Sequence, residues 1–203
     1  VLTRVLEEDY AGCPIIYNSD YCTSHNSIHH LYHAVRYQHE TQSDLSNVNT
    51  VIEWGAGYGN FAKLLCRYAQ RQMTYVMIDT PLFSCIQWLY LSSTQGTESV
   101  VLHDKPGMPI QAGKFNLVPL AFVKDRPLRG DLFVSTWALS ESSRFAQDFV
   151  AERNWFDCGK LLLAFQESTA NLPDAGRIRE LAKAAGCSIH PITFMPGNSY
   201  ALR

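Results

Sequence analysis

The sequence predicts an α/β protein whose mostly parallel sheet is covered by helices on both faces. From residue 47 onward, short apolar runs alternate with amphipathic helical patterns, which is typical of a parallel sheet. A glycine-rich turn, GAGYG at 55–59, joins the first of these runs to the first helical pattern. Two extended segments near the end of the chain flank the turn-forming stretch MPGN, which predicts a terminal antiparallel hairpin.

Composition narrows the possible functions. The 203 residues are 46% apolar and 18% charged, as expected for one globular domain. A net charge of −2 gives no basic face for nucleic acid, and no apolar run approaches the ~20 residues that span a membrane. The six cysteines form no C-x-x-C pair and no signal peptide is visible, so we expect reduced thiols in a cytoplasmic protein.

Residues 1–46 are expected to form an N-terminal helical cap that folds over the ligand site, with the main domain spanning residues 47–203. Ser24 is the predicted N-cap of the principal cap helix. A polar connection, TQSDLSNVN at 41–49, follows it. The apolar face of the helix is predicted from residues at helical spacing: Ile28, Leu31, Tyr32 and Val35.

The first half of the main domain is predicted as strand, helix, strand, helix. Strands are expected at 49–54 and 74–78. The helix between them is marked by Phe61, Leu64, Leu65 and Tyr68. Thr80 is expected to cap the next helix, with Pro81 in its first turn and an apolar side formed by Leu82, Ile86, Leu89 and Tyr90.

The third parallel strand has two candidates, 99–102 and 115–122, separated by a loop rich in proline and glycine, and we favour the second. Further strands are expected at 131–135 and 161–165, with a helix at 142–156 between them. Asp174 is the predicted cap of a last helix that Gly186 closes. The terminal hairpin is expected from 189–194 and 199–202.

The spacing of the glycines indicates the kind of ligand. Gly55, Gly57 and Gly59 form G-x-G-x-G, whereas the dinucleotide fingerprint G-x-G-x-x-G would need glycine where Asn60 stands. Glu53, two residues before the first glycine, would repel a pyrophosphate but suits a cationic or amino-bearing ligand.

A second acid completes this pattern. Asp79 ends the second predicted strand, where a carboxylate accepts hydrogen bonds from ribose hydroxyls. The two acids together call for a ligand with a ribose and without a pyrophosphate. S-adenosylmethionine fits, because it carries an adenosine, a sulfonium and an amino-acid end.

These stretches resemble motifs I and II of the class I S-adenosylmethionine-dependent methyltransferases. The resemblance rests on VIEWGAGYG at 51–59 and on the strand that ends in Asp79, and it covers residues 47–203. It implies an enzyme with a Rossmann-like sheet of seven strands, the last of them antiparallel, and S-adenosylmethionine as cofactor. The residues it implies, or places at the cofactor edge of the sheet, are Glu53, Gly55, Ala56, Gly57, Gly59, Asp79, Thr80, Ser135 and Thr136.

A second resemblance concerns the methyl acceptor. STWALSE at 135–141 is similar to the corresponding segment of a group of sugar O-methyltransferases, as are SHNSIHHLYHAVRY at 24–37 and FNLVPL at 115–120. Thr136 and Trp137 stand where that group has Asn and Tyr. The motif common in nucleic-acid amino-methyltransferases is absent from 131–142. The resemblance therefore implies a sugar or similar small hydroxyl compound as acceptor.

Two residues are candidates for the catalytic base. Glu141 lies just past the fourth predicted strand, where ligands of such sheets bind, and the alternative is a first-turn acid that complements the helix dipole. His29 lies in a helical stripe with His25 and His33, whereas His30 is expected to point away. That stripe could instead be an ordinary helix flank or a metal site, but no third ligand is identifiable, and we predict no metal.

Other functions stay open at this level. A non-catalytic binding domain could keep the same fold, because fold does not determine function. A nicotinamide-dependent oxidoreductase would also have a glycine-rich turn, although Asn60 argues against it. Methyl transfer to nitrogen or carbon also stays open, because no residue in the motifs requires an oxygen acceptor.

Overall fold

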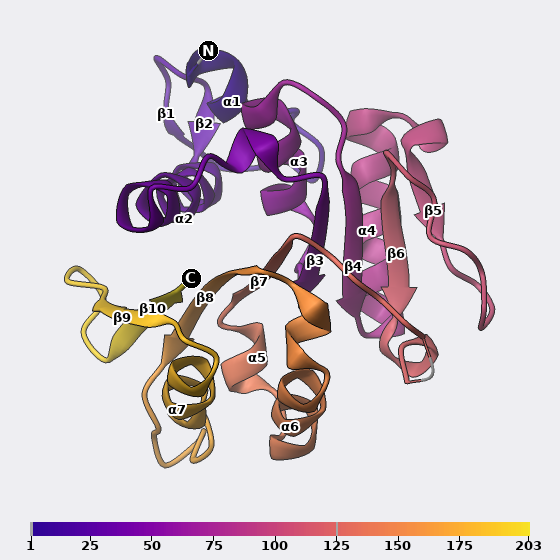
Figure 1. Ribbon diagram of the computed structural model, residues 1–203. Coiled ribbons are helices and arrows are strands. Elements are labelled where there is room, and N and C mark those ends of the chain that lie inside the picture. The colour runs from indigo at the N-terminus through magenta and orange to yellow at the C-terminus, as the bar shows by residue number, and fades with distance from the viewer. Residues whose placement is uncertain (1, 125) are drawn as a thin grey trace.

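The computed structural model describes residues 2–124 and 126–203, and these fold around one eight-stranded sheet (Figure 1). Val1, the first residue of the predicted cap, lies outside the described residues. The strand order is β5-β6-β4-β3-β7-β8-β10-β9. The bounds in that order are Val100–Leu102, Phe115–Pro119, Thr74–Asp79, Thr50–Trp54, Leu132–Thr136, Lys160–Gln166, Asn198–Leu202 and Ser188–Pro191.

The predicted sheet class is confirmed, with one strand more than expected. β5, β6, β4, β3, β7 and β8 run parallel, and β10 is antiparallel to both β8 and β9, as the terminal hairpin required. Both candidates for the third strand are strands. The favoured one, β6, lies beside β4, and the other, β5, pairs with its outer edge. The sheet therefore has eight strands instead of the predicted seven.

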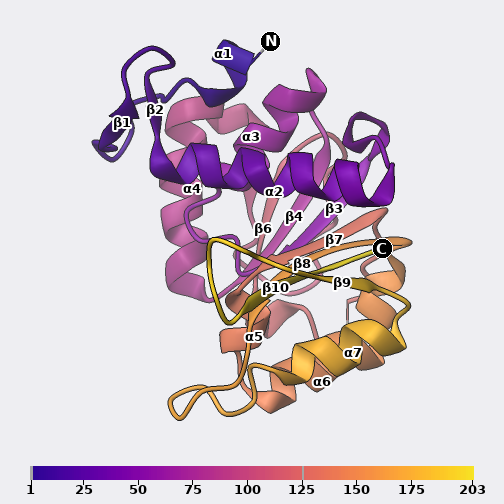
Figure 2. The same cartoon turned by 90° about the vertical axis from the view of Figure 1, so that its left-hand side faces the viewer.

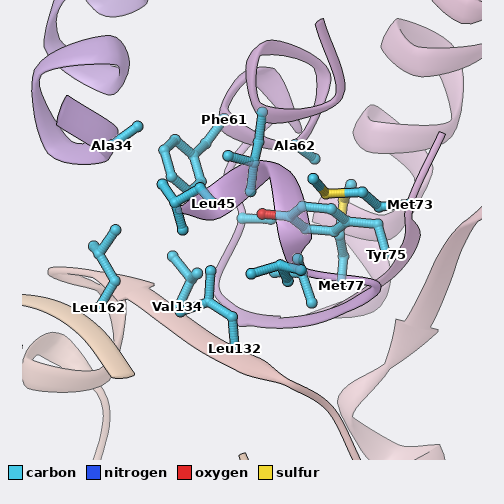
Figure 3. Packing of buried hydrophobic residues seen from close by; sticks show 14 of the residues in the cluster. Ala34, Leu45, Phe61, Ala62, Met73, Tyr75, Met77, Leu132, Val134 and Leu162 are labelled. Atoms are coloured by element: carbon cyan, nitrogen blue, oxygen red, sulfur yellow. The ribbon is translucent and has the colours of Figure 1, made fainter. Parts of the chain in front are cut away.

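Helices cover both faces of the sheet. On one face lie α2 (His25–Thr41), α3 (Asn60–Ala69) and α4 (Pro81–Gln95), and on the other lie α5 (Ala138–Glu141), α6 (Arg144–Glu152) and α7 (Arg177–Ala184). Neighbouring strand residues alternate between the two layers: Val51 packs with the first set and Ile52 with the second. Figure 3 shows the first layer, where the Tyr75 ring lies among Met73, Met77 and side chains of α3.

The N-terminal segment is less helical than predicted. After α1 (Leu2–Leu6), residues 7–24 form loops and a short hairpin of β1 (Ile16–Asn18) and β2 (Thr23–Ser24). Gly12 has φ +78° and Pro14 has no amide hydrogen to donate, so this stretch cannot continue as a helix. Ser24 is confirmed as the N-cap of α2, because its hydroxyl accepts from the Ser27 N–H at 3.2 Å. The cap boundary at residue 46 stays a prediction.

Two predicted helix faces were wrong. Most of the apolar side expected for α2 faces outward, with Val35 49% exposed, and the same holds for α4, where Leu82 is 69% exposed. α2 lies across the sheet against α3 and β10 (Figure 2), where buried polar groups find partners, such as Tyr37, which donates to the Arg203 carbonyl at 2.8 Å. The buried residues are Ser27, His33, Ala34 and Tyr37 of α2, and Ser84, Gln87 and Leu91 of α4.

Two helix boundaries also differ from the sequence prediction. α7 begins at Arg177 after Gly176, and Asp174 contributes only its backbone carbonyl, which accepts from the Arg177 N–H. The helix expected at 142–156 is shorter, beginning after the Ser143 cap and ending at Glu152. Gly186, at φ +82°, closes α7 as predicted. Within the described residues, no helix is long and apolar enough to cross a membrane.

Candidate active site

A cavity of about 480 Å³ opens where the carboxyl ends of β3, β7 and β8 meet α2. It lies at the edge of the sheet where parallel α/β folds bind ligands. Its wall brings together seven of the predicted site residues: His29, Glu53, Gly55, Ala56, Gly57, Thr136 and Glu141. Gly59, Asp79, Thr80 and Ser135 do not line it.

The glycine turn after β3 is held tightly against α5. Gly55 has φ +72°, and a Cβ at that position would lie 2.1 Å from the Cβ of Ala138. Its N–H donates to the Ile78 carbonyl at 2.9 Å, which ties the turn to β4. A Cβ on Gly57, at φ +57°, would meet nothing within 4 Å. The turn is therefore packed at its first glycine and open at its second, which leaves backbone accessible from the cavity side.

Asp79 stands beside this turn, outside the cavity wall. Gln87 of α4 donates one amide group to both Asp79 Oδ2 and the Gly57 carbonyl, each at 2.9 Å. The Thr80 N–H donates to Asp79 Oδ1 at 2.8 Å, and the Thr80 hydroxyl caps α4. Burial raises the pKa of Asp79 from its ordinary value. Gln87 was missed from the sequence, and its only signal there is a polar residue between the apolar Ile86 and Trp88.

Glu53 is 1% exposed and is the most unusual acid of the site. Its Oε2 accepts a hydrogen bond from the Tyr75 hydroxyl at 2.7 Å. Burial raises the pKa of Glu53 to about 8, against the opposing effect of the Tyr75 hydrogen bond. The carboxyl group therefore carries a proton at neutral pH in the free protein. A cationic group placed beside it would favour the ionised form.

The end of β7 contributes one residue to the cavity wall and one buried side chain that links neighbouring elements by hydrogen bonds. The buried Ser135 hydroxyl donates to the Trp54 carbonyl and accepts from the Leu139 N–H, both at 3.0 Å, so its hydrogen bonds hold β3, β7 and α5 together. Thr136 reaches the cavity. Trp137 was missed as a site residue. It has φ +66°, lines the cavity and donates its indole N–H to Asn198 Oδ1 at 2.6 Å.

Four residues of α2 face the cavity: Asn26, His29, His30 and His33. Their spacing is i, i+3, i+4, i+7, which is one face of a helix. The prediction that His30 points away was therefore wrong. Its Nδ1 lies 3.1 Å from the Asn60 amide nitrogen, and burial lowers its pKa to about 4. Burial, with His25 nearby, also lowers the pKa of His29, whose ring centroid lies 5.4 Å from that of Trp137.

Both candidate bases thus line the same cavity. Glu141 is exposed at the last position of α5, and His29 projects from α2. His29 Nε2 is buried and has no hydrogen-bond partner among the described residues. In residues 2–124 and 126–203, no group of three or more His, Cys, Asp or Glu side chains is placed to hold a metal ion.

A second cavity, of about 620 Å³, lies between the N-terminal segment and α4. Its wall is mainly apolar, including Pro14, Ile15, Ile86 and Leu89. It shares Asn26 and Tyr58 with the first cavity, so the two adjoin at the start of α2.

A buried ionic cluster fixes the N-terminal segment that forms this second cavity. Lys63 of α3 is 1% exposed, and its Nζ lies 2.8 Å from Asp9 Oδ2 and 2.7 Å from the Tyr90 hydroxyl. Arg67 pairs with the same aspartate. Glu8 accepts hydrogen bonds from the hydroxyls of Ser24 and Ser27 at the start of α2. The segment is therefore anchored to both α2 and α3.

Comparisons with known proteins agree with this architecture. No family model matches the chain, and no curated protein matches it by sequence. Among solved structures, mitomycin 7-O-methyltransferase MmcR matches with a TM-score of 0.59 at 10% identity, over 90% of this chain and 55% of that one. An O-methyltransferase family protein from Burkholderia thailandensis matches with a TM-score of 0.53 at 10% identity, over 92% and 60%.

NcsB1, an O-methyltransferase from neocarzinostatin biosynthesis, was solved with S-adenosyl-L-homocysteine and 1,4-dihydroxy-2-naphthoic acid. It matches with a TM-score of 0.53 at 14% identity, over 84% of this chain and 56% of that one. The chain thus spans less than two thirds of the length of these three proteins. At such low identity the similarity establishes the fold alone. The chain has the Rossmann-like fold of the class I methyltransferases.

Proposed function

We propose that this chain is an S-adenosylmethionine-dependent O-methyltransferase that acts on a sugar or other small hydroxyl compound. The observation that carries the proposal is the cavity itself. It joins the open face of the Gly55–Gly59 turn, the buried Glu53 carboxyl and two candidate bases in one wall. Structural neighbours with this fold are O-methyltransferases, one of them solved with S-adenosylmethionine and an aromatic hydroxy acid.

The residues present fit the cofactor. Gly57 leaves open space where a ligand approaches the backbone, and Glu53 offers a carboxyl that a cationic amino group would ionise. Asp79, oriented by Gln87 and the Thr80 N–H, is proposed to hold the ribose hydroxyls. Ala56, Gly59, Thr80 and Thr136 complete the proposed cofactor set, with Ser135 supporting it through its bonds to Trp54 and Leu139.

The bound cofactor would supply a methyl group on a sulfonium, whose sulfur leaves readily as a neutral thioether. The protein then has to orient the acceptor hydroxyl for in-line attack and remove its proton. Glu141 is proposed as the base, because it lies in the cavity wall and is open to solvent. His29 is the second candidate, and the lowered pKa that follows from its burial keeps it neutral and able to accept a proton at pH 7.

The test begins with calorimetric titration of the purified chain with S-adenosylhomocysteine and, separately, with NAD. Micromolar binding of S-adenosylhomocysteine alone is expected, and replacing Asp79 with alanine should weaken it by more than ~1 kcal/mol, because ribose hydroxyls lose their acceptor. Binding of NAD alone would favour the oxidoreductase instead. Binding of neither would favour a non-catalytic domain.

The base is tested by turnover once an acceptor is found. Glu141→Gln should lower turnover by ~10²–10⁴-fold and leave the affinity for S-adenosylhomocysteine within twofold. His29→Gln, made in parallel, should have the smaller effect. The reverse order would assign the base to His29.

A further inference from the structure

Three buried nitrogen atoms in the wall of the site cavity have no hydrogen-bond partner among the described residues. They are Nε2 of His29, Nε2 of His33 and Nε2 of Gln166. Buried polar groups are nearly always paired, and leaving one unpaired costs about 1–3 kcal/mol. Three such atoms around one cavity therefore point to a ligand that supplies their partners.

The hydrogen-bond partner of His33 fixes the character of its free nitrogen. His33 is 1% exposed, and its Nδ1 lies 2.6 Å from the hydroxyl of Tyr200 on β10. Burial lowers the pKa of His33 and raises that of Tyr200, so the imidazole is neutral and the phenol keeps its proton. The phenol has no other acceptor among the described residues, so it donates to Nδ1. The imidazole proton then resides on Nε2, which is a hydrogen-bond donor.

Gln166 provides the second donor. It is the last residue of β8, and its register partner on β10 is Asn198, another cavity residue. Its amide nitrogen can only donate. In the sheet, β7 lies between β8 and β3, which places Gln166 about 10 Å from the strand that leads into the glycine turn. Among the proposed cofactor residues, Thr136 on β7 therefore lies nearer to the strand of Gln166 than Glu53 on β3 does.

The charges around these donors limit what they bind. The titratable residues of the cavity wall are Glu53, Tyr58, Glu141 and the three histidines of α2, and its described lining includes no Lys or Arg. A carboxylate or phosphate would find no Lys or Arg side chain in this wall and would be repelled by Glu141. Neutral oxygen atoms suit neutral N–H donors better.

We propose that His33 and Gln166 form a donor pair that binds a neutral oxygen of the methyl acceptor, and that the enzyme selects uncharged sugars over sugar acids and sugar phosphates. The proposal rests on the function proposed above. It makes both residues specificity determinants, with the pair fixing one oxygen while the base attacks the proton of a neighbouring hydroxyl.

The experiment measures transfer of tritium from methyl-labelled S-adenosylmethionine to a panel of neutral hexoses, their uronic acids and their 6-phosphates. At least one neutral sugar is expected to be methylated, and its charged counterparts at least tenfold less efficiently. For that sugar, Gln166→Leu and Gln166→Glu should each raise KM at least tenfold, while the affinity for S-adenosylhomocysteine stays within twofold.

Gln38→Leu is the matched control. Gln38 lies on α2, as His33 does, but it bonds Tyr68 and does not line the cavity, so the KM of this variant should equal that of the wild type. Preference for a charged sugar, or an unchanged KM in both Gln166 variants, would overturn the proposal. Binding of S-adenosylhomocysteine with no sugar methylated would overturn the substrate class and leave the cofactor assignment standing, whereas loss of that binding would count against the proposed function itself.

Discussion

The two adjoining cavities differ in whether the buried polar groups of their walls have hydrogen-bond partners. The cavity above the strand ends contains buried nitrogen atoms without partners and a carboxyl group whose pKa is raised by burial. The cavity between the N-terminal segment and α4 is larger, but its wall is mainly apolar, and the acid that borders it, Glu8, is already hydrogen-bonded to Ser24 and Ser27. Volume alone would favour the second as the ligand site. Unsatisfied polar groups favour the first.

The largest expected effect is a loss of folding stability when the glycine turn of the first cavity is altered. Gly55→Ala places a Cβ against Ala138 and also forces an L-residue into a positive φ, so the free energy of unfolding should fall by at least ~3 kcal/mol. Gly57→Ala is the matched control, with positive φ but open space, and should cost about 1–2 kcal/mol. Urea titration measures both. Equal losses would show that packing against α5 is not the constraint.

The second largest effect is expected from removing the buried cation that anchors the N-terminal segment beside the second cavity. Lys63→Met removes a buried cation from Asp9 and Glu8, and losing one partner of a buried ion pair costs about 3–5 kcal/mol, a figure that Arg67 lowers here because it still pairs with Asp9. Residues 7–24 should then be cut sooner in limited proteolysis. The control, Lys183→Met, breaks an exposed pair with Glu180 and should cost less than ~1 kcal/mol. Unchanged proteolysis would mean that the cluster does not anchor the segment.

The third expected effect is a dependence of stability on pH that comes from the buried acid of the first cavity. Glu53 keeps its proton in the folded protein up to about pH 8, whereas in the unfolded chain it ionises near its ordinary value of 4.5. Stability should therefore fall as pH rises between these values, with this one group contributing up to about 1.4 kcal/mol per pH unit. Glu53→Gln should remove that contribution, and Glu141→Gln should not. Parallel slopes in the wild type and Glu53→Gln would contradict the buried, protonated state.

The smallest effect concerns the apolar cavity. Leu89 is 64% exposed and lines only that cavity, so Leu89→Ser should change stability by less than ~0.5 kcal/mol and leave the affinity for S-adenosylhomocysteine unchanged. Thermal unfolding and calorimetry check the two parts. A tenfold loss of affinity would mean that the cofactor binds in the apolar cavity and not in the cavity above the strand ends.

The sequence predicted those elements whose local signals are strong. The alternation of β3, α3, β4 and α4, the Thr80 and Ser24 caps and the final hairpin all follow from residue type and spacing. The buried faces of α2 and α4 did not follow. Their outward positions carry apolar residues and their inward positions carry Ser27, His33 and Gln87. The Ser27 hydroxyl, His33 Nδ1 and the Gln87 amide nitrogen bond residues on other elements, which the local pattern does not show.

The residues of the site also divide into those that local sequence signals predict and those that they do not. The glycine turn could be read from the spacing of Gly55, Gly57 and Gly59, since each strand-to-helix turn is local. Gln166 could not, because it joins the cavity only through the order of strands in the sheet. Trp137 follows the predicted Thr136, but its bond to Asn198, which is distant in sequence, could not be predicted. His30 was misplaced because α2 presents the face that contains residues 26, 29, 30 and 33, which only its packing against α3 decides.

The buried ion pair of Lys63 also sets an order of events during synthesis. Asp9 leaves the ribosome more than fifty residues before Lys63 does, so the N-terminal segment has no docking partner until α3 has been made. Contacts between positions so far apart in the chain form slowly, since a long loop must close first. The N-terminal wall of the apolar cavity is therefore expected to assemble late in folding, after the glycine turn is in place.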